Sequence, residues 1–117
     1  MESPPPSFTL DVIQKNSDFY IIFHNFWKSF PKLERNSIGQ KINSVILEIV
    51  EKMLAAAYAS KYKRVELLQQ TSEKVDLLKY LIRFAYKTKA LNQKRYLLLQ
   101  EKVIEIGKML GGWMKGA

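Results

Sequence analysis

The single histidine, His24, is the side chain of this sequence best suited to acid–base chemistry or metal binding. A helical metal site would need carboxylates or further histidines one turn away, but the nearest acidic residue, Asp18, lies six positions before it. His24 instead stands between Phe23 and Phe26, which is typical of a histidine that makes one hydrogen bond in a core or an interface. We therefore predict no metal site and no catalytic role for His24.

Other catalytic patterns are also missing. Small helical ribonucleases set an arginine about four to six residues before a histidine, whereas here the only upstream basic residue is Lys15, nine positions before His24. The chain has no phosphate-binding glycine loop, no GxSxG elbow and no helix-turn-helix signature. It also has no cysteine, which excludes thiolate zinc sites and cysteine nucleophiles. We expect no enzymatic activity and no cofactor, with a ribonuclease-like enzyme as the weakest alternative.

Positive charge is the chemistry that the sequence does supply. Nineteen Lys and Arg against eleven Asp and Glu give a net charge of +8. Lys79, Arg83 and Lys87 recur four apart, so they form one strip along a helix. Further basic residues follow around the next turn, namely Lys89, Lys94 and Arg95, and a second group lies in "KYKR" (Lys61, Lys63, Arg64). Such a strip favours contacts with phosphates rather than with base edges. The alternative is a solvated face that serves solubility.

Helices must position these residues, because no segment alternates apolar and polar residues with the period of a strand. Residues 1–8 are rich in Pro and Ser, which predicts a flexible leader. Residues 9–117 predict one all-α domain, with helices at about residues 10–30, 36–59, 62–88 and 92–114. The connections between them are short, which favours an antiparallel up-down-up-down four-helix bundle. Asn92 is a suitable N-cap for the last helix.

Three helices carry more apolar residues than one core stripe requires. On the third helix a second apolar flank lies roughly opposite the core residues, and the first helix has two surplus aromatic residues. The predicted outer residues are Leu77, Tyr80, Leu81, Phe84, Tyr20 and Trp27. Soluble monomers rarely expose such surfaces, so we expect these residues to bury against further copies of the chain. Alternatively, they pack around one small bundle.

The end of the chain, "EIGKMLGGWMKGA", places glycines inside a helical pattern. Gly107 and Gly111 have a small-xxx-small spacing, which predicts close approach of the last turns to another helix. The alternative is a fraying end at Gly111 and Gly112, against which Trp113 argues, because a large ring gains most when it is buried.

Location is constrained by what the sequence lacks. The longest apolar runs, "YIIF" and "MLAAAYA", are much shorter than the roughly 20 residues that span a bilayer. The first residues, "MESPPPS", lack the form of a signal peptide. Together with the absence of cysteine, this leads us to expect a cytoplasmic protein that does not enter a membrane.

The chain resembles the accessory variability determinant (Avd) proteins of diversity-generating retroelements. The resemblance covers about residues 10–116 and is carried by "FWKSFPKLERNSIGQKI", "MLAAAYAS", "LLKYLIRFAYKTKALNQKRY" and "EIGKMLGGWMK". The Avd proteins are part of a wider group of small four-helix bundles, which includes proteins encoded in intervening sequences of 23S ribosomal RNA genes.

This resemblance implies a homopentameric ring or barrel whose basic surface binds the retroelement's reverse transcriptase and its template RNA or DNA. The polymerase would perform the mutagenic copying. By matched position, Lys79 and Arg83 in "LLKYLIRF" and Lys32 and Arg35 in "FPKLER" are the implied contacts. The alternative is a bundle of the ribosomal-intervening-sequence type, an oligomeric structural protein without a nucleic-acid role.

Overall fold

The computed structural model describes residues 7–116, with side chains described from residue 10, and every regular element in that range is an α-helix. Four long helices make up the bundle: α1 (Ser7–Trp27), α3 (Ile38–Ala57), α4 (Lys61–Lys87) and α5 (Gln93–Gly116). A single turn, α2 (Lys32–Arg35), interrupts the connection from α1 to α3. The predicted four-helix bundle is therefore confirmed.

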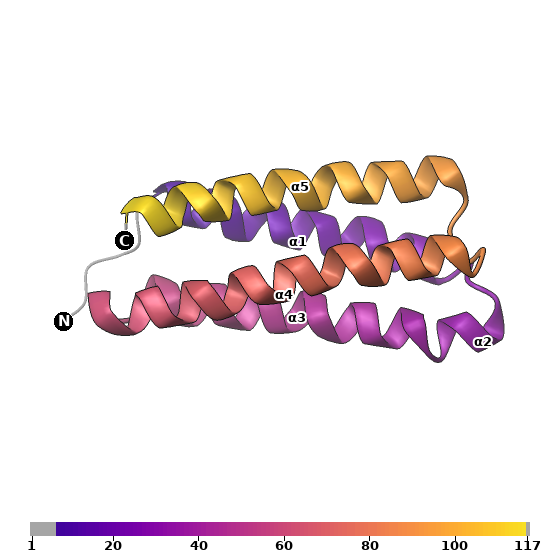
Figure 1. Cartoon of the computed structure of the whole chain (residues 1–117), viewed down its shortest axis with the longest axis horizontal. Coiled ribbons are helices and arrows are strands. Elements are labelled where there is room, and N and C mark those ends of the chain that lie inside the picture. The colour runs from indigo at the N-terminus through magenta and orange to yellow at the C-terminus, as the bar shows by residue number, and fades with distance from the viewer. Residues whose placement is uncertain (1–6, 117) are drawn as a thin grey trace.

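The long helices run alternately in opposite directions along a body of 48 × 22 × 20 Å. α3 packs on α4, α4 on α5, and α1 on both α3 and α5, so each long helix has two neighbours. α2 and the α4–α5 turn lie at one end of the bundle, at the right of Figure 1, and the α3–α4 turn lies at the other. This arrangement brings Lys32 and Arg35 of α2 to the same end as Lys89 of the α4–α5 turn.

The core follows the helical periodicity of the sequence. α3 buries a stripe whose members recur at three and four positions, comprising Ile42, Val45, Ile46, Ile49 and Met53. α1 contributes Phe19 and Phe23, and α5 contributes Leu99, Val103 and Leu110. These side chains form one continuous apolar cluster, so the four long helices share a single core.

The helix ends differ slightly from the predicted ones. α1 begins at Ser7, directly after the prolines, so Ser7 and Phe8 are helical rather than part of the leader. The rest of the predicted leader, residues 1–6, lies outside the described residues. α1 ends at Trp27 rather than near residue 30, because Pro31 disfavours helical backbone before it. The amide nitrogen of Phe30 donates to the carbonyl oxygen of Trp27 at 3.0 Å, and the Phe30 ring turns into the core.

The connection from α1 to α3 is fixed by Trp27. Its indole Nε1 donates to the carbonyl oxygen of Arg35 at 2.9 Å. Its ring lies against Gly39, where any Cβ atom would overlap the indole. Trp27 was predicted to face another copy of the chain, but its polar atom and much of its ring are used inside the protomer.

Burial also corrects the predicted outer surface of α4. Leu81 is buried in the protomer core, so its assignment to an outer flank is wrong. The cause is that α4 packs against both α3 and α5, which widens its buried arc. Leu77 and Tyr20 are half-buried against the same core. Of the predicted outer residues, Tyr80 (59%) and Phe84 (48%) remain the most exposed.

The end of α5 is anchored by a buried tryptophan. The helix continues through all of its glycines to Gly116, and Trp113 is buried as expected. A Cβ atom at Gly107 would lie 3.8 Å from both Lys79 Nζ and Val75 Cγ1, and one at Gly111 would meet nothing within 4 Å. Within the protomer, therefore, no other helix backbone approaches closely at these glycines, and the buried Trp113 ring holds the last turns.

Candidate nucleic-acid interface

The basic strip of α4 lies beside α5. Lys79, Arg83 and Lys87 follow one another at intervals of one turn; Arg83 and Lys87 are exposed, and Lys79 is half-buried. Lys79 Nζ lies 3.9 Å from Asp76 Oδ1, a long ion pair in which Asp76 is largely exposed. Such a pair contributes little to stability, so the Lys79 ammonium is available to another anion.

A surface groove of about 570 Å³ runs between α4 and α5 along this strip. Its walls combine basic, aromatic and aliphatic side chains: Asp76, Lys79, Tyr80 and Arg83 from α4, and Tyr96, Gln100 and Ile104 from α5. Gln100 Nε2 donates to the carbonyl oxygen of Lys79 at 3.0 Å and so joins the two walls. Tyr96 stacks on Tyr86 with ring centroids 4.4 Å apart, a second link between the helices. Contacts within the protomer thus fix the positions of the two walls of the groove.

The α4–α5 turn presents Lys89 and Lys94 to solvent. Lys89 has a φ of 68°, in the left-handed region where glycine is the least costly residue. Its backbone nitrogen donates to the carbonyl oxygen of Tyr86 at 3.0 Å and so helps to close α4. A lysine therefore occupies a position at which glycine would cost less free energy.

Arg95 faces a different side of the bundle from the α4 strip. Its guanidinium carbon lies 4.6 Å from the centre of the Phe26 ring of α1, a cation–π contact. Its backbone nitrogen donates to Asn92 Oδ1 at 2.8 Å, which confirms Asn92 as the N-cap of α5. The structure therefore separates Arg95 from the groove that holds Lys79 and Arg83.

Lys32 and Arg35 are exposed on α2, at the same end of the bundle as the α4–α5 turn (Figure 1). Between them Leu33 is 77% exposed, an unusual position for a leucine. The structure thus gathers these two predicted contacts with Lys87, Lys89 and Lys94 at one end, although they come from a separate part of the chain.

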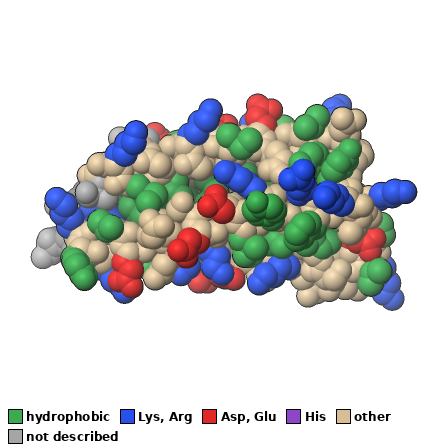
Figure 2. Space-filling model, viewed as in Figure 1, with side chains coloured by type: hydrophobic (Ala, Val, Ile, Leu, Met, Phe, Trp, Pro, Cys, Tyr) green, Lys and Arg blue, Asp and Glu red, His purple; other side chains and the backbone are tan. Residues whose placement is uncertain are grey.

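The charged residues of the bundle are distributed unevenly between its two ends. We define the basic half as residues 19–47 and 77–100, which surround α2 and the α4–α5 turn. It holds ten Lys and Arg and a single acid, Glu34. The remaining described residues, the balanced half, hold nine Lys and Arg and nine Asp and Glu. In Figure 2 the basic half lies at the right, where basic side chains stand beside hydrophobic ones. The net charge of the protein thus comes from one half of the bundle.

Several basic side chains of the balanced half have partners within the protomer. Lys15 pairs with Glu105 at 3.1 Å, and Lys63 pairs with Glu66 at 3.2 Å. Arg64 donates to the carbonyl oxygens of Ala56 and Ala59, both at 2.9 Å, and so caps the end of α3. Arg64 and Lys63, in the second basic group of the sequence, thus serve the fold.

One ion pair of the balanced half also lowers the pKa of a carboxyl group. Lys74 Nζ lies 3.0 Å from Glu48 Oε2. The Lys74 hydrogen bond holds the pKa of Glu48 below its ordinary value, although desolvation of the carboxylate opposes the shift. The charges of Lys74, Lys41 and Lys52 act in the same direction as that bond.

Sequence reasoning missed several members of this surface. Lys28 and Lys41 lie in the basic half but were not singled out, and Gln100 and Ile104 complete the groove. One signal was available, because no Asp or Glu occurs from Leu77 to Gln100. The groove had no such signal, since it depends on how α5 rotates against α4.

The described residues offer no cluster of side chains that could hold a metal ion. Among them, no three His, Asp or Glu side chains are grouped as a metal site would require. His24 is half-buried between the rings of Tyr20 and Trp27, with centroids 6.0 and 6.3 Å away. No described helix is long and apolar enough to cross a bilayer.

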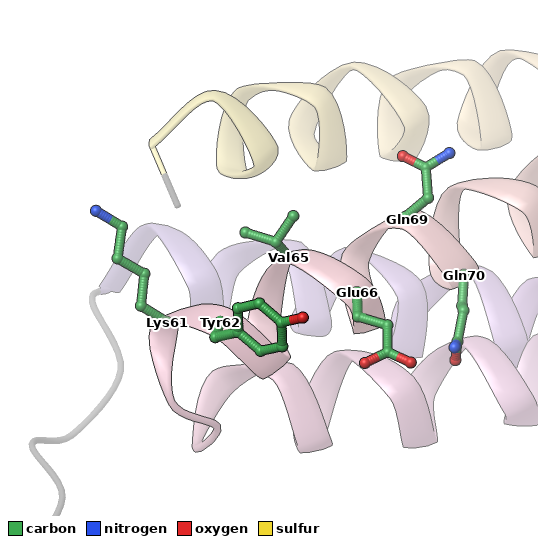
Figure 3. Close-up of a pocket in the computed structure, with 6 residues that line it drawn as sticks. All are labelled: Lys61, Tyr62, Val65, Glu66, Gln69 and Gln70. Atoms are coloured by element: carbon green, nitrogen blue, oxygen red, sulfur yellow. The ribbon is translucent and has the colours of Figure 1, made fainter.

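A second hollow, of about 800 Å³, lies along the first turns of α4 in the balanced half (Figure 3). Its described lining comprises Lys61, Tyr62, Val65, Glu66, Gln69 and Gln70. The Glu66 carboxylate is bonded to Lys63, and the Gln70 Oε1 accepts from Lys52 Nζ at 3.1 Å. This hollow contains none of the predicted contact residues.

Comparisons with known proteins agree on the type of bundle. The model of the bAvd-like family matches residues 11–117. The crystal structure of a protein of unknown function from the S23 ribosomal protein family of Bacteroides thetaiotaomicron is similar, with a TM-score of 0.83 and 17% identity. The match covers 92% of this chain and 98% of that one. No curated protein matches the sequence. At this identity the solved structure supports the fold alone.

Proposed function

The chain belongs to the bAvd-like family, and from this membership we propose that it is a non-enzymatic accessory protein of a diversity-generating retroelement. In this proposal it binds the retroelement's reverse transcriptase and template RNA through its basic half, in the cytoplasm. The polymerase performs the copying, and this chain supplies a binding surface for it.

The observation that carries the proposal is the division of charge. Ten Lys and Arg face a single Glu in the basic half, and of these ten only Lys79 has an ion pair among the described residues. A concentrated, unneutralised surface of this kind attracts a polyanion and releases its counterions on binding. Because the charges lie on helix faces and turns, they suit phosphates, and binding should depend weakly on sequence.

Self-association forms part of the proposal, with five protomers in a ring as the family resemblance implies. Large apolar side chains are exposed on every long helix, and Phe84 and Leu97 are among those in the basic half. A ring would repeat the basic half around its axis and so multiply the local charge. Analytical ultracentrifugation at micromolar concentration should give the mass of five protomers, and a single protomer there would contradict this part.

The direct test replaces charges in each half by the same amount. Lys79→Glu with Arg83→Glu should weaken RNA binding about ten-fold or more near 0.1 M salt, because two phosphate contacts become repulsive. Lys61→Glu with Lys108→Glu, two exposed lysines of the balanced half, is the matched control and should change affinity much less. Fold and assembly mass are checked for both variants. Equal losses in the two pairs would reject the assignment.

Two further observations bear on the wider role. A reverse-transcriptase gene beside this one, with paired variable and template repeats, would support the retroelement assignment. RNA cleavage by the purified protein, abolished by His24→Ala, would contradict the non-enzymatic role.

A second candidate function is an oligomeric structural protein without a nucleic-acid role. Its support is the set of large apolar side chains exposed on every long helix, which suit self-association. The two candidates differ in one property that is simple to measure. A stable oligomer that is not retained on heparin at low salt would favour the structural protein.

A further inference from the structure

We propose that the groove between α4 and α5 binds an unpaired base of a single-stranded nucleic acid, which stacks on Tyr80 while Arg83 and Lys79 hold the adjacent phosphates. This inference rests on the proposed function, because it specifies what the basic half binds. The shared ligand chemistry is a flexible strand, RNA or DNA, with accessible base faces.

Tyr80 is the available ring of this groove. Its side chain is 59% exposed, and it belongs to none of the aromatic pairs among the described residues. Tyr86 and Tyr96, by contrast, already stack on one another with planes only 12° apart. Because Tyr86 and Tyr96 already stack on each other, the ring of Tyr80 is the aromatic surface of the groove that a ligand can stack on.

The charges near Tyr80 are placed to hold a strand. Lys79 precedes Tyr80 in the sequence, and Arg83 lies about one helical turn beyond it on the same wall. Asp76 lies about one turn before Tyr80 and is 3.9 Å from Lys79 Nζ, so the Arg83 side of Tyr80 is the basic end of the groove, where the positive charge has no acidic partner. Phosphates favour the basic end, which fixes the side of Tyr80 on which the backbone of the strand lies.

The opposite wall completes a site for a base. Ile104 of α5 is 46% exposed and offers an aliphatic surface across the groove from α4. The hydrogen bond from Gln100 to the carbonyl oxygen of Lys79 fixes the two walls. A volume of about 570 Å³ lies within the range of ordinary small-ligand sites. The groove therefore exists before a strand binds.

These features favour a single strand over a duplex. In a duplex the base faces are stacked inside the helix, and a shallow groove on a bundle could contact only phosphates. An aromatic ring beside basic residues is the arrangement by which proteins bind single strands with little sequence preference.

The test uses the full chain and fluorescent oligonucleotides of equal length: single-stranded RNA, single-stranded DNA, duplex RNA and an abasic strand. Tyr80→Ala should weaken binding of a single strand about ten-fold and leave duplex binding within two-fold. Tyr80→Phe should keep the affinity, because the ring remains. Tyr62→Ala, which removes the 88% exposed tyrosine of the balanced half on the same helix, is the matched control and should have no effect.

A base analogue reports the stacking directly. A 2-aminopurine in the strand should lose fluorescence on the native protein and on Tyr80→Phe, but not on Tyr80→Ala. Native affinity for the abasic strand should equal the affinity of Tyr80→Ala for the ordinary strand. The strand, RNA or DNA, that shows the Tyr80-dependent loss identifies the ligand.

Three results would overturn the inference: equal losses for single strand and duplex, no loss for either single strand, or a changed assembly mass in Tyr80→Ala. The last would make Tyr80 a contact between subunits. If Lys79→Glu with Arg83→Glu still weakens RNA binding about ten-fold or more in those cases, the proposed function stands and only the base site fails.

Discussion

The two halves of the bundle contain almost equal numbers of Lys and Arg, ten in the basic half and nine in the balanced half, yet they use them differently. In the balanced half, Lys15, Lys63 and Lys74 pair with carboxylates and Arg64 caps α3. In the basic half, a long ion pair at Lys79 and the cation–π contact of Arg95 are the interactions that the described structure gives the charged groups. The function of a basic residue here depends on its neighbours rather than on its type.

This comparison also separates stability from binding. A residue with partners inside the protomer contributes to the free energy of unfolding, whereas a residue without them mainly shapes the potential that a ligand meets. Substitution of a basic residue that has partners, such as Arg64, should therefore change stability, and substitution of an unpaired basic residue in the basic half should change affinity.

The largest expected change in stability comes from a pair of glycines, one in each half. Gly39→Ala should lower the free energy of unfolding by about 1–3 kcal/mol, because the new Cβ atom would overlap the Trp27 indole. Gly111→Ala should leave it unchanged or raise it by up to about 1 kcal/mol, since nothing lies within 4 Å of that position. Urea unfolding of the two variants measures both changes. An equally stable Gly39→Ala protein would contradict the role given to Trp27.

A pair of arginines gives the next largest effect. Arg64→Met should cost about 1–2 kcal/mol, because the carbonyl oxygens of Ala56 and Ala59 lose a charged donor. Arg83→Met should change stability by less than about 0.5 kcal/mol and weaken RNA binding instead. Thermal unfolding and RNA titration of both variants check the contrast. A loss of stability in Arg83→Met together with a loss of RNA affinity in Arg64→Met would contradict the division between the halves.

At Lys89, one substitution should raise the stability of the protein and lower its affinity for RNA. Lys89→Gly should raise the free energy of unfolding by up to about 1 kcal/mol, because its φ of 68° suits glycine better. RNA affinity should fall at the same time, since one positive charge is lost. Lys89→Gln is the control, because it removes the charge and keeps the backbone cost. A stabilised variant with unchanged affinity would remove Lys89 from the binding surface.

The fold was largely predictable from the sequence because apolar periodicity determines which helix face is buried. Ile42, Ile46 and Ile49 are buried as their spacing predicts. Leu81 was not predictable in the same way, since its burial depends on α4 having two neighbours. Leu54 lies among the same apolar residues of α3 in the sequence, but its side chain is 45% exposed.

The candidate site was predictable in charge but not in shape. Lys79 and Arg83 share a face because they are four residues apart, which a sequence shows directly. That Tyr80 and Ile104 flank a groove depends on the contact between two helices that are distant in the chain. The hydrogen bond from Trp27 Nε1 to the carbonyl oxygen of Arg35 depends on how the chain turns at Pro31.

The smallest expected effect concerns Glu48 and pH. Because the pKa of Glu48 is lowered in the folded state, its stabilisation is present at neutral pH and is lost as pH falls below its ordinary value of 4.5. Glu48→Gln should cost a few tenths of a kcal/mol at pH 7, the scale of an exposed ion pair. In urea unfolding, that difference from the native protein should shrink steadily as the pH is lowered below 4.5. A difference that stays constant there would contradict the ion pair with Lys74.

The most direct test of the account is the salt dependence of RNA binding in charge-matched variants. The first variant changes three exposed lysines of the basic half to Gln: Lys87, Lys89 and Lys94. The second variant changes three exposed lysines of the balanced half to Gln: Lys61, Lys108 and Lys115. For a single strand, the slope of log K against log salt falls by about 0.7 for each lost phosphate contact. We predict that the first variant lowers the slope by about 2 and that the second leaves it unchanged. Equal slopes in the two variants would contradict the division of the bundle into a binding half and a balanced half.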